Sequence, residues 1–196
     1  MLALSVAALA FSGPQALRTA GTSSVSMAAK SKAVPFLDAP PALEGYIGNK
    51  GFDPLGFSGV NMKWMVEAEL KHCRLAMLAT AGWLAVDFGA RFPGSEYSAV
   101  PNALAAHDFG VAKGDLVMLL LIVTALETVS LFATMQMLKG ETDRKPGQFY
   151  FDPLGFGKGD MAKLQLNEIS NGRLAMIAFS GIVTQAAITK GGFPYM

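Results

Sequence analysis

Hydrophobic residues gather in three long segments of the chain, at about 61–90, 114–138 and 161–190. At 1.5 Å of rise per residue, a helix formed by any of these segments is long enough to cross a bilayer. Proline and glycine residues between the segments favour breaks in helical structure. The pattern therefore predicts an all-α membrane protein with three transmembrane helices.

An internal repeat relates the first and third segments. The sequence FDPLGF occurs at 52–57 and again at 151–156, an offset of 99 residues. Without gaps, 14 of the 39 positions from 52 to 90 are identical to their partners at this offset, which indicates a duplication. Because one helix separates the two copies, the first and third helices run in the same direction. They can therefore be related by a pseudo-two-fold axis along the membrane normal.

Composition agrees with a membrane protein and excludes several other classes. Hydrophobic residues make up 52% of the chain and charged residues 16%, against about 25% charged residues in soluble domains. The net charge of +1 gives no reason to expect a nucleic-acid partner. The single cysteine, Cys73, excludes an intrachain disulfide and is expected to be a packing residue. His72 and Cys73 point about 100° apart on a helix, so they form no nucleophile–base pair, and we expect no enzymatic activity.

The N-terminus has the composition of a targeting segment. Residues 1–11 form a short apolar run that contains Ala8-Leu9-Ala10, and the following residues are rich in Ser and Thr, with no acidic residue before Asp38. A signal sequence followed by a transit segment predicts a plastid reached through the secretory route. We expect residues 1–27 to be this presequence and residues 28–196 to form a single domain. A plain disordered N-terminus is the alternative.

Charged residues at bilayer depth need partners. Glu69 and Arg74 are five residues apart, as are Glu168 and Arg173, so within one helix each pair is turned by about 140°. An unpaired charge in a bilayer costs at least about 2.5–3.5 kcal/mol. The two-fold relation predicts reciprocal ion pairs between the helices, Glu69 with Arg173 and Glu168 with Arg74. Small residues would let the two backbones approach closely: Ala76, Ala79, Gly82, Ala175, Ala178 and Gly181.

Further polar side chains lie in the same segments without an evident partner. His72 and Asn171 each follow a repeat glutamate by three residues, and Gln185 returns to within about 40° of Asn171, about 21 Å further along. Glu127 stands in LLLIVTALETVSLF, with no Lys or Arg in its own segment. These ligands are dispersed, unlike those of a protein-ligated metal. They suit separate macrocycles that each bring a hard Mg²⁺, because a carboxylate held by Arg keeps one free oxygen. For His72, a satisfied core histidine is the alternative.

The paired motifs E-x-x-H-x-R-x-A-M and E-x-x-N-x-R-x-A-M, each preceded by F-D-P-L-G-F, resemble those of the light-harvesting chlorophyll-binding family. The resemblance covers residues 45–190 and implies three transmembrane helices, the first and third crossed and locked by the reciprocal Glu–Arg pairs. The only metal implied is the Mg of chlorophyll, with Arg74 and Arg173 as ion-pair partners and six axial ligands: Glu69, His72, Glu127, Glu168, Asn171 and Gln185. Asp53 and Asp152 would lie near the polar ends of two carotenoids.

Some features depart from the green-plant pattern of this family. The chain ends in GGFPYM soon after the third segment, so we expect no C-terminal amphipathic helix with its His ligand. Leu119 stands where a second ligand of the middle helix would be. His107 is expected in a loop facing water, with ligation of another pigment as the alternative. The AKSKAVPFL segment and Phe11 resemble the fucoxanthin–chlorophyll a/c proteins of algae with red-derived plastids. That resemblance implies chlorophyll a, chlorophyll c and carotenoids such as fucoxanthin.

The function implied is that of a multi-pass antenna protein in the thylakoid membrane, which passes excitation energy to a photosystem. Its expected partners are membrane lipids, the core of photosystem I or II and other antenna subunits in an oligomer. One rival is a photoprotective quencher, marked by acidic residues on the lumenal side: Asp87, Glu96, Asp108 and Asp115. A rival of another class is a small membrane transporter built from repeats, whose charges would line a path.

Overall fold

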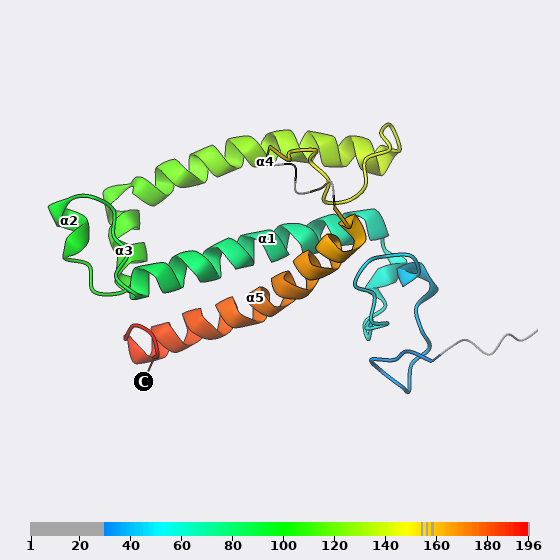
Figure 1. The fold of residues 1–196 in the computed structure, drawn as a ribbon, viewed down its shortest axis with the longest axis horizontal. Coiled ribbons are helices and arrows are strands. Elements are labelled where there is room, and N and C mark those ends of the chain that lie inside the picture. The colour runs from blue at the N-terminus through cyan, green and yellow to red at the C-terminus, as the bar shows by residue number, and fades with distance from the viewer. Residues whose placement is uncertain (1–29, 154, 156, 158, 196) are drawn as a thin grey trace, which may run out of the picture.

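The structure is a computed structural model that describes residues 30–153, 155, 157 and 159–195. The expected presequence, 1–27, lies outside the described residues, as do Leu154 and Phe156 of the second FDPLGF copy. The described part is all-helical apart from one isolated β-bridge, between Lys30 and Asp38. Its elements are two 3₁₀ turns, η1 (Pro41–Leu43) and η2 (Phe57–Gly59), and five α-helices, α1 (Met62–Asp87), α2 (Ser95–Ser98), α3 (Ala103–Lys113), α4 (Asp115–Lys139) and α5 (Met161–Thr189) (Figure 1).

The three long helices coincide with the three predicted segments, and each bound lies within three residues of the prediction. The short helices α2 and α3 lie in a connection that the sequence did not predict to be helical. Among the described helices, α4 and α5 are long and apolar enough to cross a membrane. Helix α1 is also long, but its first half carries five charged residues, so length and composition support two of the three predicted spans.

Helices α1 and α5 begin in the same way because the repeat includes their capping residues. The Asn61 side chain accepts hydrogen bonds from the backbone N–H groups of Lys63 and Trp64. Asp160, 99 residues later, accepts one from the N–H of Lys163. A side-chain oxygen at this position satisfies N–H groups that have no partner within the helix. The duplicated sequence thus sets the start of both helices.

Helix α1 packs mainly against α5, and the two helices lie side by side in Figure 1. Their closest approach is at Cys73 and Gly172, which are equivalent positions in the repeat. A Cβ added to Gly172 would lie 2.6 Å from Cys73 Sγ, closer than real Cβ contacts. The expectation that Gly82 and Gly181 permit the close approach is wrong, because a Cβ at either position would meet nothing within 4 Å. Close packing therefore depends on the one glycine at the contact.

Two more glycines extend the repeat beyond FDPLGF. Gly48 has φ +79° and lies against Ile169, while Gly147 has φ +78° and lies against Leu70. Both the glycines and their contacts are related by the offset of 99 residues. A Cβ at Gly48 would lie 2.6 Å from Ile169 Cγ2, so neither the backbone conformation nor the space suits a larger residue. Each copy therefore begins with a loop that packs on the other copy's helix.

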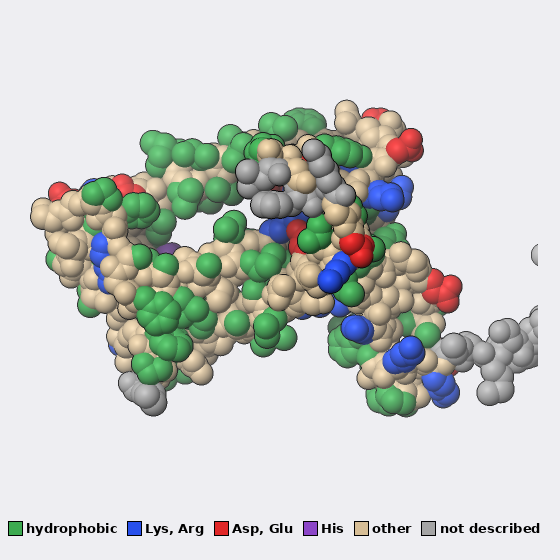
Figure 2. Space-filling view, viewed as in Figure 1, with side chains coloured by type: hydrophobic (Ala, Val, Ile, Leu, Met, Phe, Trp, Pro, Cys, Tyr) green, Lys and Arg blue, Asp and Glu red, His purple; other side chains and the backbone are tan. Residues whose placement is uncertain are grey.

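Helix α4 stands apart from the α1–α5 pair along much of its length. Figure 2 shows an opening between α4 and the other long helices, with hydrophobic side chains along α4. Many large apolar side chains of α4 are exposed, among them Leu120, Leu121, Leu126, Val129 and Phe132. At one end α4 is joined to α3, where Gly110 allows the Leu116 side chain to pack closely. So much exposed apolar surface requires lipid or another apolar partner.

Candidate functional site

Two reciprocal ion pairs join α1 and α5. Arg74 Nε lies 2.7 Å from Glu168 Oε1, and Arg173 Nε lies 2.7 Å from Glu69 Oε1. Arg173 also donates a hydrogen bond to the carbonyl of Gly48. All four charged side chains are partly buried, and each glutamate uses Oε1 alone. Among the described residues, Oε2 of both glutamates has no hydrogen-bond partner, so each neutral pair retains one ligand oxygen.

Both ion pairs border apolar cavities. Glu69 and Arg173 line a cavity of about 570 Å³, which is formed by α1, α5 and the segment that contains the first FDPLGF copy. Glu168 and Arg74 line a smaller cavity of about 120 Å³ beside the loop at 145–148. The repeat thus places a polar pair at the edge of two apolar cavities, and the different loops make the cavities unequal in size.

His72 is exposed on α1 and has one ring nitrogen fixed. Nδ1 lies 2.7 Å from the backbone carbonyl of Ala68, one turn earlier. This contact assigns the ring proton to Nδ1, because a carbonyl can only accept, and it leaves the lone pair of Nε2 available to a ligand. The geometry is that of an oriented histidine on the helix surface rather than a core histidine.

Asn171 and Gln185 are exposed on α5, and their side chains have no hydrogen-bond partner among the described residues. The structure does not bring the six predicted ligands together. No group of three or more His, Cys, Asp and Glu side chains that could hold a metal ion occurs in the described part of the chain. The predicted ligands thus do not form a single metal site, and their binding of chlorophyll stays a prediction.

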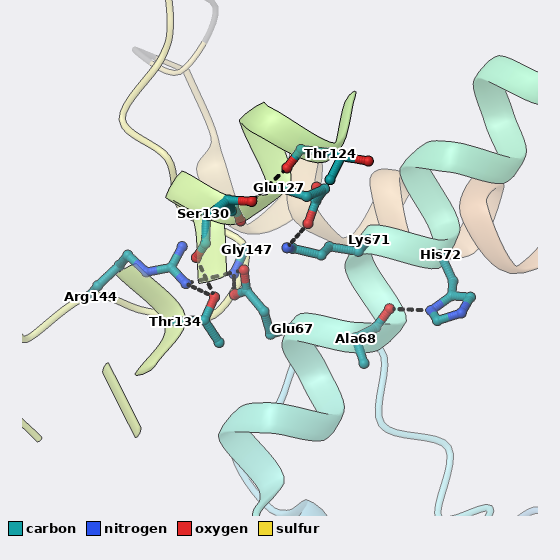
Figure 3. A network of polar contacts seen from close by, with 11 residues as sticks. Glu67, Ala68, Lys71, His72, Thr124, Glu127, Ser130, Thr134, Arg144 and Gly147 are labelled. Carbon is teal, nitrogen blue, oxygen red and sulfur yellow. Dashed lines mark hydrogen bonds and ion pairs between the residues drawn. The ribbon is translucent and has the colours of Figure 1, made fainter. Parts of the chain in front are cut away.

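Glu127 has a partner that the sequence analysis missed. It was expected to be without a cation because α4 offers none nearby, but Lys71 Nζ from α1 lies 2.5 Å from Glu127 Oε2 (Figure 3). Glu127 remains the more exposed of the two, at 56% against 29% for Lys71. The expected isolated carboxylate is therefore half of an ion pair between helices.

Glu67 is a buried residue whose role the sequence did not show. Its side chain is 1% exposed, accepts a hydrogen bond from the N–H of Gly147 at 2.6 Å, and lies 3.1 Å from Arg144 (Figure 3). Arg144 also donates to Thr134 at the end of α4. Glu67 and Lys71 are four residues apart, a spacing that suits an ion pair within one helix, so no sequence signal indicated their partners outside α1.

The aspartates of the two FDPLGF copies accept hydrogen bonds from the loops in which they lie. Asp53 accepts hydrogen bonds from the N–H groups of Phe57 and Ser58. Hydrogen bonding by the Ser58 side chain, and then by its backbone N–H, lowers the pKa of Asp53. Asp152 accepts a bond from the N–H of Gly157 at 2.7 Å. The expected contact of both residues with carotenoid ends stays a prediction.

At the other end of the long helices, Asp87 is the last residue of α1 and connects neighbouring segments of the chain. Its carboxylate accepts hydrogen bonds from the N–H groups of Ala103 and Phe193 and from the Tyr195 hydroxyl at 2.8 Å. Burial and then the bond to Asp87 raise the pKa of Tyr195 to about 12. This carboxylate thus holds the C-terminal segment and the start of α3 against the end of α1.

The other acids proposed as markers of a quencher also have contacts. Glu96 pairs with Lys113, Asp115 accepts from the Tyr97 hydroxyl, and Asp108 lies near His107. His107 was expected in a loop, but it lies on α3, because Asn102 caps this stretch and Gly114 ends it. It is exposed, as expected.

Comparison of the sequence with known proteins identifies its family. The chlorophyll A-B binding protein family matches residues 39–187. Chlorophyll a-b binding protein 1B-21 of Hordeum vulgare is 38% identical over 159 residues, which cover 75% of this chain and 63% of the relative. Photosystem I chlorophyll a/b-binding protein 5 of Arabidopsis thaliana is 34% identical over 187 residues, covering 81% and 71%. Chlorophyll a-b binding protein 6 of the same plant is 34% identical over 163 residues, covering 79% and 68%.

The matched part thus spans 63% to 71% of the length of these three relatives. The family match extends over both FDPLGF copies and the three long helices almost to the end of α5. It includes both ion pairs and all six predicted ligands. The chain belongs to the chlorophyll a-b binding protein family.

Proposed function

We propose that this protein is a light-harvesting antenna of the thylakoid membrane, which binds chlorophylls and carotenoids and passes excitation energy to a photosystem. The observation that carries this proposal is the pair of reciprocal Glu–Arg bridges, each with a carboxylate oxygen that no described residue uses. We also propose that α1 spans the membrane beside α4 and α5, crossing α5 about a pseudo-two-fold axis. Residues 1–27 would be the presequence that directs the chain to the plastid.

The residues present fit chlorophyll. Its Mg²⁺ takes oxygen or nitrogen ligands, and the chain offers carboxylate, amide and imidazole atoms dispersed over α1, α4 and α5. Because each carboxylate is already neutralised, its ligand oxygen brings no net charge into an apolar layer. Six residues would hold chlorophyll by this chemistry: Glu69, His72, Glu127, Glu168, Asn171 and Gln185. Bound chlorophyll would supply the absorption of light and the excited state.

The protein's own residues would position the pigments and keep water away. Close packing of α1 on α5 at Cys73 and Gly172 gives a stiff frame on which the ligand atoms have fixed separations. The apolar side chains along α4 and around the two cavities provide surfaces that favour flat, apolar molecules over water. Nothing in this arrangement requires a catalytic step.

For the accessory pigments we propose chlorophyll c and carotenoids such as fucoxanthin beside chlorophyll a. The AKSKAVPFL segment supports this proposal through its resemblance to the fucoxanthin–chlorophyll a/c proteins. The relatives described above are named as chlorophyll a-b proteins, so chlorophyll b is the competing accessory pigment. Since one relative is a photosystem I protein, a photosystem I core is one proposed partner, beside photosystem II, other antenna subunits and membrane lipids.

Pigment extraction from the purified native protein tests this proposal, together with a fluorescence excitation spectrum of chlorophyll a. The antenna function predicts bound chlorophyll a and carotenoid bands in the excitation spectrum, because energy absorbed by the carotenoid must reach chlorophyll. Chlorophyll c with fucoxanthin would support the algal subtype, and chlorophyll b would exclude it. A folded but colourless protein would contradict the antenna function.

A further inference from the structure

Helix α4 is connected to α1 by very few side chains. In the part of the chain that the structure describes, the bond from Lys71 Nζ to Glu127 Oε2 is the only side-chain hydrogen bond that joins these two helices directly. Figure 3 shows the two side chains extending toward each other from α1 and α4. The bond therefore crosses between α4 and the α1–α5 pair, which Figure 2 shows to be separated over much of their length.

Charge explains why Glu127 needs a partner from another helix. The nearest cation within α4 is Lys139, which is about 18 Å further along the helix. The hydroxyls of the neighbouring threonines are used inside α4, with Thr128 Oγ1 donating to the carbonyl of Thr124. A carboxylate without a compensating charge is costly inside a bilayer. The Lys71 ammonium neutralises the Glu127 carboxylate, and the carboxylate in turn neutralises the ammonium.

The bond to Lys71 leaves one oxygen of the Glu127 carboxylate available to a ligand. Lys71 contacts Oε2 alone, and Oε1 of Glu127 has no partner among the described residues. The Glu127 side chain is also well exposed, so a ligand can reach this oxygen. About two turns further along α4, Arg144 donates to Thr134 and also pairs with Glu67 of α1. This second connection between α4 and α1 limits how far Glu127 can move.

We propose that Lys71 is a positioning residue for a chlorophyll-binding site at Glu127. It neutralises the carboxylate and holds Oε2, so that Oε1 would be free to bind the Mg²⁺ of one chlorophyll. This inference rests on the proposed antenna function. It assigns to α1 a role in a site whose ligand belongs to α4, and it gives Lys71 a function distinct from the Glu–Arg pairs of the repeat.

The test compares chlorophyll per chain and the thermal unfolding midpoint in variants of the full chain, purified with pigments. Lys71→Met should lose one chlorophyll and lower the unfolding midpoint, because Glu127 is left without its cation. Lys71→Arg should keep the chlorophyll because the positive charge remains. Adding Glu127→Gln to Lys71→Met should restore the chlorophyll, because a neutral amide needs no cation and retains a ligand oxygen. Adding Glu127→Leu instead should restore the unfolding midpoint but not the chlorophyll. Lys63→Met, at an exposed lysine two turns earlier on α1, is the control and should change neither quantity.

Three outcomes would overturn the inference while wild-type protein still binds pigment. These are a full chlorophyll complement in Lys71→Met, no recovery on adding Glu127→Gln, and recovery of chlorophyll on adding Glu127→Leu. The last would show that the pair is only a structural link. Absence of chlorophyll from the wild-type protein is a different result, which would contradict the proposed antenna function itself.

Discussion

The contact between Cys73 and Gly172 leaves no room for an added side-chain atom. Replacing Gly172 by Ala adds a Cβ that would lie 2.6 Å from Cys73 Sγ and 3.0 Å from Cys73 Cα, where ordinary contact begins at 3.4 Å. The helices must therefore separate by nearly 1 Å at this point. Since Arg173 follows directly on the glycine, the separation would also stretch an ion pair that is 2.7 Å long.

The expected change in the free energy of unfolding follows from two opposing effects. Overpacking a close contact costs about 1–3 kcal/mol, and the cost here should be about 2–3 kcal/mol because the added Cβ meets the backbone of Cys73, which cannot rotate away. The better helix propensity of Ala returns about 1 kcal/mol. We expect Gly172→Ala to lower the free energy of unfolding by about 1–2 kcal/mol, which corresponds to a fall in Tm of about 2–8 °C for a chain of this size. Adding Cys73→Gly removes the opposing Cβ, so the double variant should be more stable than the sum of the single changes by at least about 1 kcal/mol.

Thermal unfolding of the purified protein in detergent, followed by circular dichroism, measures these differences. Gly59→Ala serves as the control, because a Cβ there would meet nothing within 4 Å and the backbone is not left-handed. An unchanged Tm for Gly172→Ala would refute the close contact. Additive effects in the double variant would show that Cys73 and Gly172 do not meet across the helices.

Three further predictions test other parts of the structure. Glu69→Gln should retain more chlorophyll than Glu69→Leu when pigments are extracted, because the amide keeps a ligand oxygen; equal losses would count against direct ligation. Arg144→Leu should lower the free energy of unfolding by about 3–5 kcal/mol, since it leaves Glu67 buried without its cation, and adding Glu67→Leu should recover most of the loss in denaturant titrations. Because the pKa of Tyr195 is raised from 10.0 to about 12, docking of the C-terminal segment should be complete below pH 10 and weaken between pH 10 and 12. Phenolate absorption should show a late-titrating tyrosine that Tyr195→Phe removes, and its persistence in that variant would contradict the assignment.

The repeat allowed much of this structure to be predicted. The spacing of five residues between Glu69 and Arg74 forbids a pair within one helix, so the second copy had to supply each partner. The structure contains both reciprocal pairs at 2.7 Å. The ends of the long helices were also close to prediction, because apolar runs and capping residues are local features of the sequence.

Features without a counterpart in the repeat were not predictable. Glu127 lies on the unrepeated helix, so no offset could indicate Lys71 as its partner. Arg144 lies in a loop whose path decides whether it reaches Glu67, and loop paths depend on tertiary packing. The close approach of the helices occurs where the copies differ, at Cys73 and Gly172, rather than at the shared glycines Gly82 and Gly181.

The central claim, that a neutral Glu–Arg pair holds chlorophyll rather than only the helices, is tested by the variant Arg74→Leu with Glu168→Leu. Replacing both partners of a buried ion pair by apolar residues is often neutral for stability, so the fold should persist. The measurement is the number of chlorophylls per chain in this variant and in the wild-type protein. The account predicts the loss of one chlorophyll with the remaining pigments retained, and a full complement would contradict it.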